Sequence, residues 1–314
     1  MTERQPHICV AADKSKLLIC GTKQLKASKQ PAGMNIEVEG KVIEESESEK
    51  LLGLILNNEL TWRNHLYGDN SNKGLIPQLS GRIGIMKQLS KHMSREKLQY
   101  FANGIFYSKL NYCLAVFGNV FGLDKFKEEN NRYTSFTKYD NHRLQTLQNQ
   151  LNRVLVNAAR NTPTSELLEA TNSLSIQQLI AYQTVLMAHK ITKSGKPVYL
   201  HKKLQVIKSA HSLRGRNEQY QHPKYKLSLA REAFVYRASC ISNKMDANVR
   251  NEPSIEAFKV SSKEWVKANI LIKPAKEPSL NQRVERRNVN QNIRQPIQNQ
   301  QNTIRRYFNP INHP

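Results

Sequence analysis

Metal-dependent phosphoryl or nucleotidyl transfer is the first chemistry to look for in this sequence, and it requires clustered carboxylates. Closely placed acidic side chains hold two metal ions beside the reacting phosphate in such sites. The chain has five aspartates, none adjacent to another, namely Asp13, Asp69, Asp124, Asp140 and Asp246. We therefore expect no metal site, no cofactor and no autonomous enzymatic activity from this chain.

Motifs for other chemistries are also missing. Residues 81–84 (GRIG) lack the GK[ST] ending of a phosphate-binding loop, and no G-x-S-x-G nucleophile motif occurs. The cysteines have neither zinc-ligand spacing nor a disulfide pattern, and they are Cys9, Cys20, Cys113 and Cys240. No apolar run is long enough for a membrane span, and the N-terminus lacks a signal-peptide core. These patterns predict an intracellular protein, nuclear or cytoplasmic, with no membrane partner and no small-molecule substrate.

Charge is the strongest compositional signal. The 314 residues include 48 Lys and Arg against 25 Asp and Glu, a formal net charge of +23. Cations that neutralise phosphates release counterions, so an RNA or DNA backbone is the expected partner. The competing interpretation is a basic surface that is merely solvated.

Candidate nucleic-acid contacts combine basic and aromatic side chains. Trp62 and Trp265 could stack on bases or lie in a core, and His65 is more typical of a cap or surface contact than of catalysis. The run 201–226 mixes cations with Tyr220 and Tyr225, as either a phosphate-binding strip or a solvated loop. The candidates are Lys50, Trp62, Arg63, His65, Lys202, Lys203, Arg214, Arg216, Tyr220, Lys224, Arg286, Arg287, Arg305 and Arg306.

Short strands are expected to begin the fold. Residues 16–21 (KLLICG) form an apolar run, and in residues 35–40 Ile36 and Val38 alternate with glutamates as in a half-buried strand. Residues 41–43 can return as the second arm of a hairpin, and residues 50–56 (KLLGLIL) form a further apolar run. Together they predict a small antiparallel sheet over residues 15–57.

Helical periodicity begins after Thr61. One helix is expected to bury Leu75, Leu79, Ile83, Met86 and Leu89, and the next, capped by Ser94, to bury Leu98, Phe101, Ile105 and Tyr112. A surface loop is expected before a helix whose buried face starts at Leu144. Further start and stop signals are Pro163 at a first helical position, Ser175 with Gln178, Gly195 with Pro197, and Ser254. Residues 273–314, rich in Asn, Gln and Arg, predict a disordered basic tail. The expected class is α+β and mostly α.

Several phrases occur in one order along residues 10–272. Each is weak alone, but their order and spacing are specific. They are residues 13–22 (DKSKLLICGT), 48–54 (SEKLLGL), 60–62 (LTW), His65, 105–108 (IFYS), 112–113 (YC), 117–118 (FG), 144–145 (LQ), 148–149 (QN), Arg153, 162–163 (TP), 167–168 (LL), 174–179 (LSIQQL), 197–200 (PVYL), 258–259 (FK) and Trp265. In this the chain resembles the C-terminal part of reverse transcriptases of non-LTR (LINE-type, jockey-like) retrotransposons, a class of transposable element.

The resemblance implies an architecture. Residues 1–57 would be the end of a polymerase palm, with residues 51–53 near the primer grip, and residues 58–122 a helical thumb-like region that cradles the template–primer duplex. Residues 123–142 would be a loop and 143–272 a helical C-terminal region, whereas the tail of residues 273–314 has no counterpart in the family. The family's catalytic aspartates belong to a segment expected before Met1, and Mg²⁺ is expected only for an intact parent polymerase. Two positions depart from the family, since Phe117 replaces a tryptophan and only Asn243 remains of a Trp-Asn-x-Leu-Pro motif.

Three functional hypotheses follow. The first is a fragment of an RNA-directed DNA polymerase that binds template–primer nucleic acid without catalysis. The second is a chain that completes an active polymerase when the catalytic part is supplied. The third is an inert or co-opted helical module that interacts with proteins, in which the charge serves solubility.

Overall fold

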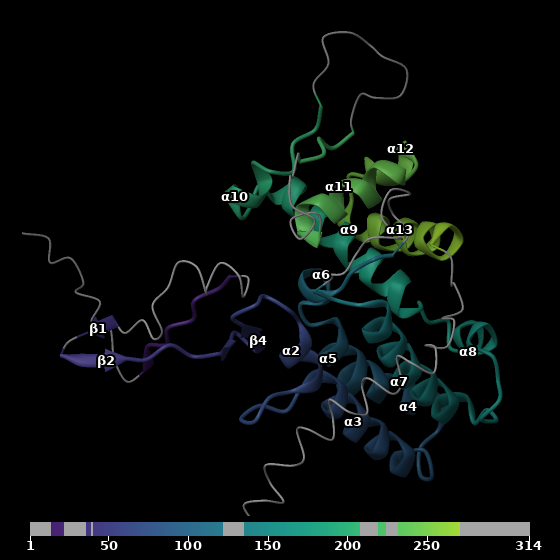
Figure 1. Ribbon diagram of the computed structural model, residues 1–314. Coiled ribbons are helices and arrows are strands. Elements are labelled where there is room, and N and C mark those ends of the chain that lie inside the picture. The colour runs from purple at the N-terminus through teal and green to yellow at the C-terminus, as the bar shows by residue number, and fades with distance from the viewer. Residues whose placement is uncertain are drawn as a thin grey trace, which may run out of the picture. The chain divides into compact units, whose positions relative to one another are not determined.

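The protein is mostly helical, with two short antiparallel strand pairs near the N-terminus (Figure 1). The computed structural model describes residues 14–21, 36–38, 40–121, 135–207, 219–223 and 232–270. The chain divides into a unit of residues 1–272 and a unit of residues 273–314. The tail predicted for the second unit lies outside the described residues.

The strands form two separate hairpins and not one sheet. Residues 50–56 are not a single strand, because the chain reverses at Leu52 and Gly53, whose φ angles of 46° and 84° are both positive. Residues 16–21 contribute only an isolated bridge between Leu17 and Glu45. The strand expected within residues 35–40 and its hairpin return at residues 41–43 are confirmed, but Ile36 is 43% exposed, so the expected burial of its side chain is wrong. The hairpins are β1 (Ile36–Val38) with β2 (Lys41–Ile43), and β3 (Ser48–Leu51) with β4 (Leu54–Asn57).

Six short and medium helices follow the strands. The helix expected from residue 75 is confirmed, and its predicted face is buried from Leu75 to Met86. In chain order they are α2 (Arg63–Tyr67), α3 (Leu75–Leu89), α4 (Arg95–Ala102), the π-helix η2 (Asn103–Tyr107), α5 (Ser108–Asn111) and α6 (Leu114–Phe117).

The π-helical turn changes which side chains of this stretch are buried. We expected Leu98, Phe101, Ile105 and Tyr112 to form the buried stripe. Of these four, only Leu98 is buried. The other buried side chains follow it at intervals of four residues, and they are Ala102, Phe106 and Leu110. A π turn is wider than an α turn, so it rotates the following residues relative to a 3.6-residue period. Tyr112, which follows the π turn, is 47% exposed, and Phe101, which precedes it, is 43% exposed.

Longer helices build the second part of the described chain. The helix expected from residue 143 begins at Lys138, because Thr137 and Asp140 form a capping box. Pro163 lies one residue before its helix and not at the first helical position. The helices are α7 (Lys138–Val156), α8 (Thr164–Ala170), α9 (Ile176–Ser194), α10 (Val198–His201), α11 (Phe234–Lys244), α12 (Ala247–Arg250) and α13 (Ile255–Asn269).

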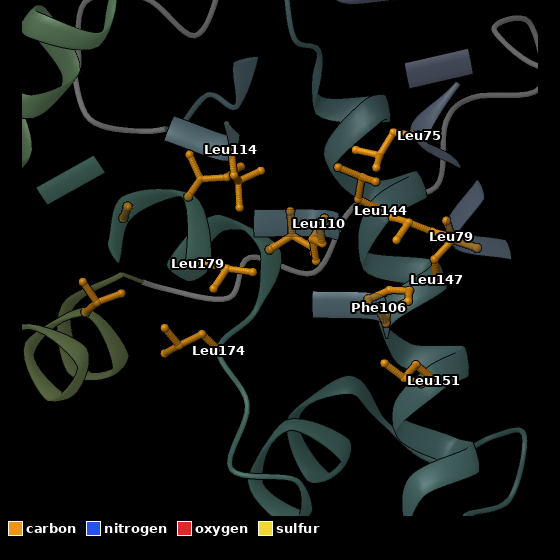
Figure 2. Close-up of a cluster of buried hydrophobic side chains, with 14 of the residues drawn as sticks. Leu75, Leu79, Phe106, Leu110, Leu114, Leu144, Leu147, Leu151, Leu174 and Leu179 are labelled. Carbon is orange, nitrogen blue, oxygen red and sulfur yellow. The ribbon is translucent and has the colours of Figure 1, made fainter. Parts of the chain in front are cut away.

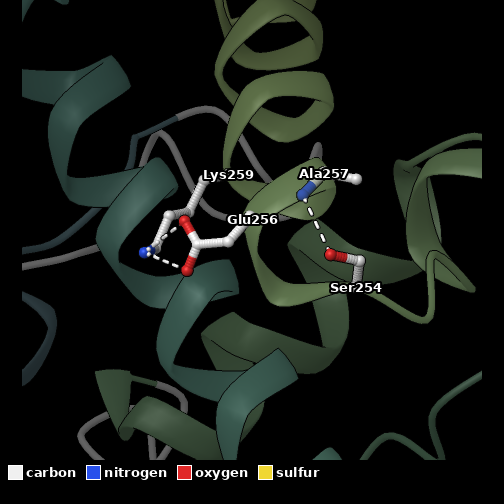
Figure 3. Close-up of polar contacts among 4 residues, drawn as sticks. All are labelled: Ser254, Glu256, Ala257 and Lys259. Carbon is white, nitrogen blue, oxygen red and sulfur yellow. Dashed lines mark hydrogen bonds and ion pairs between the residues drawn. The ribbon is translucent and has the colours of Figure 1, made fainter.

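The termini of α9 and α13 agree with the predictions. Ser175 and Gln178 form a capping box, and Gly195 ends α9 with a φ of 68°. At α13 the Ser254 hydroxyl accepts a hydrogen bond from the Ala257 backbone N–H (Figure 3). One turn further on, Glu256 and Lys259 pair at 2.9 Å.

A large apolar core joins the helices on both sides of residue 122. Figure 2 shows how α3, η2, α5, α6, α7 and α9 contribute to it. The labelled members are Leu75, Leu79, Phe106, Leu110, Leu114, Leu144, Leu147, Leu151, Leu174 and Leu179. A second, smaller cluster packs α9 and α11 around Leu204 and Tyr220.

One buried cation links α11 to α6. The guanidinium of Arg237, a residue only 2% exposed, donates hydrogen bonds to the carbonyl oxygens of Ala115, Val116 and Gly118 at the C-terminal end of α6. Its Nε also donates to the Glu232 carbonyl at 2.9 Å. Burial lowers the pKa of Arg237 to about 10, and the Glu232 charge opposes that shift. Arg237 therefore remains charged at neutral pH and satisfies carbonyls that end a helix.

Candidate functional site

The β3–β4 hairpin places the first residues of the site. Its two-residue connection has two positive φ angles, which suits the twist of paired strands. A Cβ at Gly53 would also lie 3.3 Å from Cε1 of Tyr112, a tight contact from which the ring would have to shift slightly. The Tyr112 hydroxyl donates to the Leu52 carbonyl at 2.6 Å. The hairpin tip is thereby held against the end of α5.

A pocket of about 290 Å³ lies between this hairpin, α2, the start of α3 and α5. Three of its lining side chains are lysines, Lys50 from β3, Lys73 from the loop before α3, and Lys109 from α5. Among the described residues, none that lines it carries a carboxylate. Polar donors in the lining include His65, Asn72 and Gln78. The pocket therefore combines cations and neutral donors, as anion sites do.

The cations of this pocket repel one another. Burial lowers the pKa of Lys109, and the charges of Arg82 and Lys50 lower it further. Arg82 donates to the Ile105 carbonyl, which directs its guanidinium toward η2. An anion between these groups would replace like-charge repulsion by attraction, so the site is electrostatically suited to a phosphate.

The buried side chain of His65 forms part of the pocket wall. It is 5% exposed, so the expected surface or cap contact is wrong. Its Nδ1 accepts from the Ile55 backbone N–H at 3.4 Å, and its ring contacts Phe117 at 4.9 Å between centroids. Burial, and secondarily Lys109, lower the pKa of His65 to about 4. At neutral pH the imidazole is uncharged with its proton on Nε2, which makes Nε2–H a neutral donor.

An aspartate outside the pocket orders the loop that carries Lys73. The Asp69 carboxylate accepts from the Ser48 hydroxyl at 2.8 Å and from the backbone N–H groups of Ser71 and Asn72 at 2.9 and 2.6 Å. Burial tends to raise the pKa of Asp69, but these hydrogen bonds outweigh it and lower the pKa. The loop is therefore tied to β3 by a charged acceptor.

Of the predicted nucleic-acid contacts that fall within the described residues, Lys50 and His65 line the pocket. Trp62, just before α2, lies edge-on to His65 and tilted to Phe117, with ring centroids 6.3 and 6.2 Å away, and packs partly buried against the core. Arg63 is exposed on α2, and Lys202 and Lys203 are exposed after α10.

Two aromatic candidates belong to the interior. Trp265 is 7% exposed and Tyr220 is 6% exposed, so Trp265 takes the core position that was its alternative, and neither ring presents an open face to a base. Tyr220 is held by Asn243, which accepts from its backbone N–H at 2.7 Å and donates to its carbonyl at 2.8 Å. The remaining candidates lie outside the described residues: Arg214, Arg216, Lys224, Tyr225, Arg286, Arg287, Arg305 and Arg306.

Sequence reasoning missed Lys73, Lys109 and Arg82. Each is a single cation on a different element, and no local pattern connects them. Lys50 and Lys109 line the same pocket because of where β3 and α5 lie relative to each other. The sequence of neither segment alone specifies that arrangement.

Two further searches concern the described part of the chain. None of its helices has the length and apolarity to cross a membrane. Within the same residues, no group of three or more His, Cys, Asp or Glu side chains is placed to hold a metal ion. The fold and site define a helical protein with a lysine-lined pocket, and no family model, curated protein or solved structure matches the chain.

Proposed function

We propose that this chain is the C-terminal part of a non-LTR retrotransposon RNA-directed DNA polymerase and binds template–primer nucleic acid without catalysing synthesis. One observation carries the binding proposal: Lys50, Lys73 and Lys109 meet in a pocket that no carboxylate lines among the described residues. The assignment to the polymerase family rests on the ordered sequence phrases. The lack of catalysis rests on the isolated aspartates.

The chemistry of the pocket supports a phosphate ligand. Lysine is a point charge that contacts phosphate without demanding one geometry, and such contacts give affinity without base preference. Nucleic-acid binding should therefore fall steeply with salt and depend little on sequence. The hairpin of β3 and β4 carries the residues that the resemblance places near the primer.

The test is binding of a labelled primer–template duplex, followed by fluorescence anisotropy from about 50 to 200 mM salt. The variant Lys50→Gln/Lys109→Gln removes two pocket cations, and Lys87→Gln/Lys91→Gln removes two exposed lysines at and just beyond the C-terminal end of α3. We expect the first variant to bind more weakly and to lower the salt slope by about 2, and the second to change binding little. Both variants have the same net charge, so overall charge cannot explain a difference.

Two results would overturn the proposal. One is the absence of detectable duplex binding by the wild-type chain at low salt. The other is an equal loss of affinity in the pocket variant and its matched control, which would mean that charge acts without a site.

A further inference from the structure

The rim of the lysine-lined pocket exposes apolar and aromatic side chains to solvent. Leu51 is 58% exposed, Leu52 is 83% exposed and Tyr112 is 47% exposed. Leu51 ends β3 directly after Lys50, Leu52 is the first residue of the turn, and Tyr112 contacts Gly53, which lines the pocket. Cations and exposed apolar groups therefore adjoin each other at the hairpin tip.

Leu52 departs from the local rules of hairpin turns. Its φ of 46° is in the left-handed region, which Asn and Gly adopt with least strain. Turn chemistry alone would favour Asn-Gly at positions 52 and 53. A leucine that is both strained and 83% exposed is not explained by the folding of this hairpin. Such conflicts are expected at functional positions.

Tyr112 is held in position before any ligand binds. Its hydroxyl donates to the Leu52 carbonyl at 2.6 Å, and its ring edge lies against Gly53. Because these contacts fix the ring while nearly half of the residue stays exposed, a planar ligand group could stack on it with little loss of side-chain entropy.

We propose that this rim stacks an unpaired base while the lysine pocket holds an adjacent phosphate. The proposal rests on the proposed function and specifies the form of the nucleic acid that the rim binds. That form is a single strand or an unpaired strand end, and not an uninterrupted duplex. Every base has a π-face, but in a duplex interior those faces are covered by neighbouring bases. Stacking sites beside a cationic groove are how proteins bind single strands without sequence preference.

Charge complementarity favours nucleic acid over a protein partner for this rim. Lys50, Lys109 and Arg82 influence one another electrostatically beside it. An apolar protein surface docked here would remove these cations from water without compensating them, which is costly. A strand supplies the compensating phosphates and the flat apolar groups together.

The experiment compares two probes with the same number of phosphates, an oligothymidine of about 16 nucleotides and a blunt hairpin duplex. Tyr112→Leu removes the ring and keeps an apolar side chain, and Tyr112→Phe keeps the ring but loses the hydrogen bond to Leu52. We expect Tyr112→Leu to weaken oligothymidine binding by about 5- to 100-fold and to leave duplex binding unchanged. Tyr112→Phe should retain most of the single-strand affinity.

A second variant keeps the test decisive if Tyr112→Leu does not fold. Leu52→Asn relieves the left-handed strain, so it should raise the melting temperature while weakening oligothymidine binding. Unchanged oligothymidine binding in Leu52→Asn and in any folded Tyr112→Leu would overturn the rim proposal. Equal losses for both probes would overturn it as well. If wild type binds neither probe, the proposed function itself fails, which is a separate result.

Discussion

Two cationic sites of this protein have opposite relations to their surroundings. Arg237 is 2% exposed and donates to four backbone carbonyls, three of them at the end of α6. Lys109 lines a pocket together with Lys50 and Lys73, where no carboxylate of the described residues reaches the lining. Burial lowers the pKa of both Lys109 and Arg237.

The difference teaches how to separate structural from functional charges here. A cation whose donors all end on protein acceptors stabilises the fold and has no capacity left for a ligand. A cation that faces other cations is destabilised by like-charge repulsion, and a bound anion relieves that repulsion. The total charge of +23 cannot distinguish these cases, because it counts both equally.

The largest expected effect is at the satisfied site. Arg237→Met removes the donor to the buried carbonyls of Ala115 and Gly118 and to the part-buried carbonyl of Val116, which should lower the free energy of unfolding by roughly 3 kcal/mol. Urea denaturation measures this change. Arg63→Met, at an exposed arginine on α2, is the control and should alter stability little. Similar urea midpoints for the two variants would mean that Arg237 does not stabilise the fold more than an exposed arginine does.

The same junction is sensitive to one methyl group. A Cβ at position 118 would lie 2.7 Å from the Leu114 carbonyl oxygen and 2.8 Å from Ile180 Cγ1. Gly118→Ala should therefore destabilise by about 1–3 kcal/mol through overpacking. Gly81→Ala, at a helical glycine of α3 with nothing within 4 Å of the new Cβ, should instead stabilise by about 0.5–1 kcal/mol. Thermal melts of the two variants would contradict this account if they shifted in the same direction.

His65 makes the pocket wall sensitive to acid. Its pKa is about 4 in the folded chain and near 6.5 when unfolded, so between these values the unfolded state binds the extra proton. The free energy of unfolding contributed by His65 is thus fully present above pH 6.5 and falls as pH drops toward 4, by about 1.4 kcal/mol for each pH unit at most. Urea titrations at several pH values measure this slope, and His65→Asn should make it shallower. An unaltered slope would show that His65 is not buried in its neutral form.

The smallest effect on stability is expected at the open site. Lys109→Met removes one of the mutually repelling cations, so the free energy of unfolding should change by less than about 0.5 kcal/mol, and upward if at all. Duplex affinity should nevertheless fall, with a salt slope smaller by about 1. This opposition between stability and binding is typical of functional positions. A clear loss of stability would place Lys109 with Arg237 as a structural charge.

Local sequence signals identified much of the helical fold. The caps at Ser175 and Ser254 and the stop at Gly195 are made by side chains and backbone within a few residues, so they can be predicted without tertiary information. The same pattern at Thr137 and Asp140 was present in the sequence and would have moved the start of α7 to Lys138. The reversal at Leu52 was missed because leucine is not a residue that turn rules favour.

The candidate site was less predictable than the fold. Lys50 and His65, predicted as nucleic-acid contacts, both line the pocket, but the sequence favours a surface position for His65 and gives no signal for Lys73 and Lys109. Tyr220 and Trp265 were offered as stacking rings because a sequence does not reveal which face of an aromatic residue is covered. Tyr112 had been assigned to the core, and the π-helical turn at residues 103–107 turned it outward.

The sequence by itself determined the charge excess, the isolated aspartates, most helix termini and the mostly helical class, since composition and short-range hydrogen bonding decide these. Tertiary structure alone decided which cations are satisfied and which are open. Arg237 reaches carbonyls more than a hundred residues away in the chain, whereas Lys50 and Lys109 meet each other across a hairpin and a helix. Whether a charge finds an acceptor depends on distances between elements, and these arise only when the core packs.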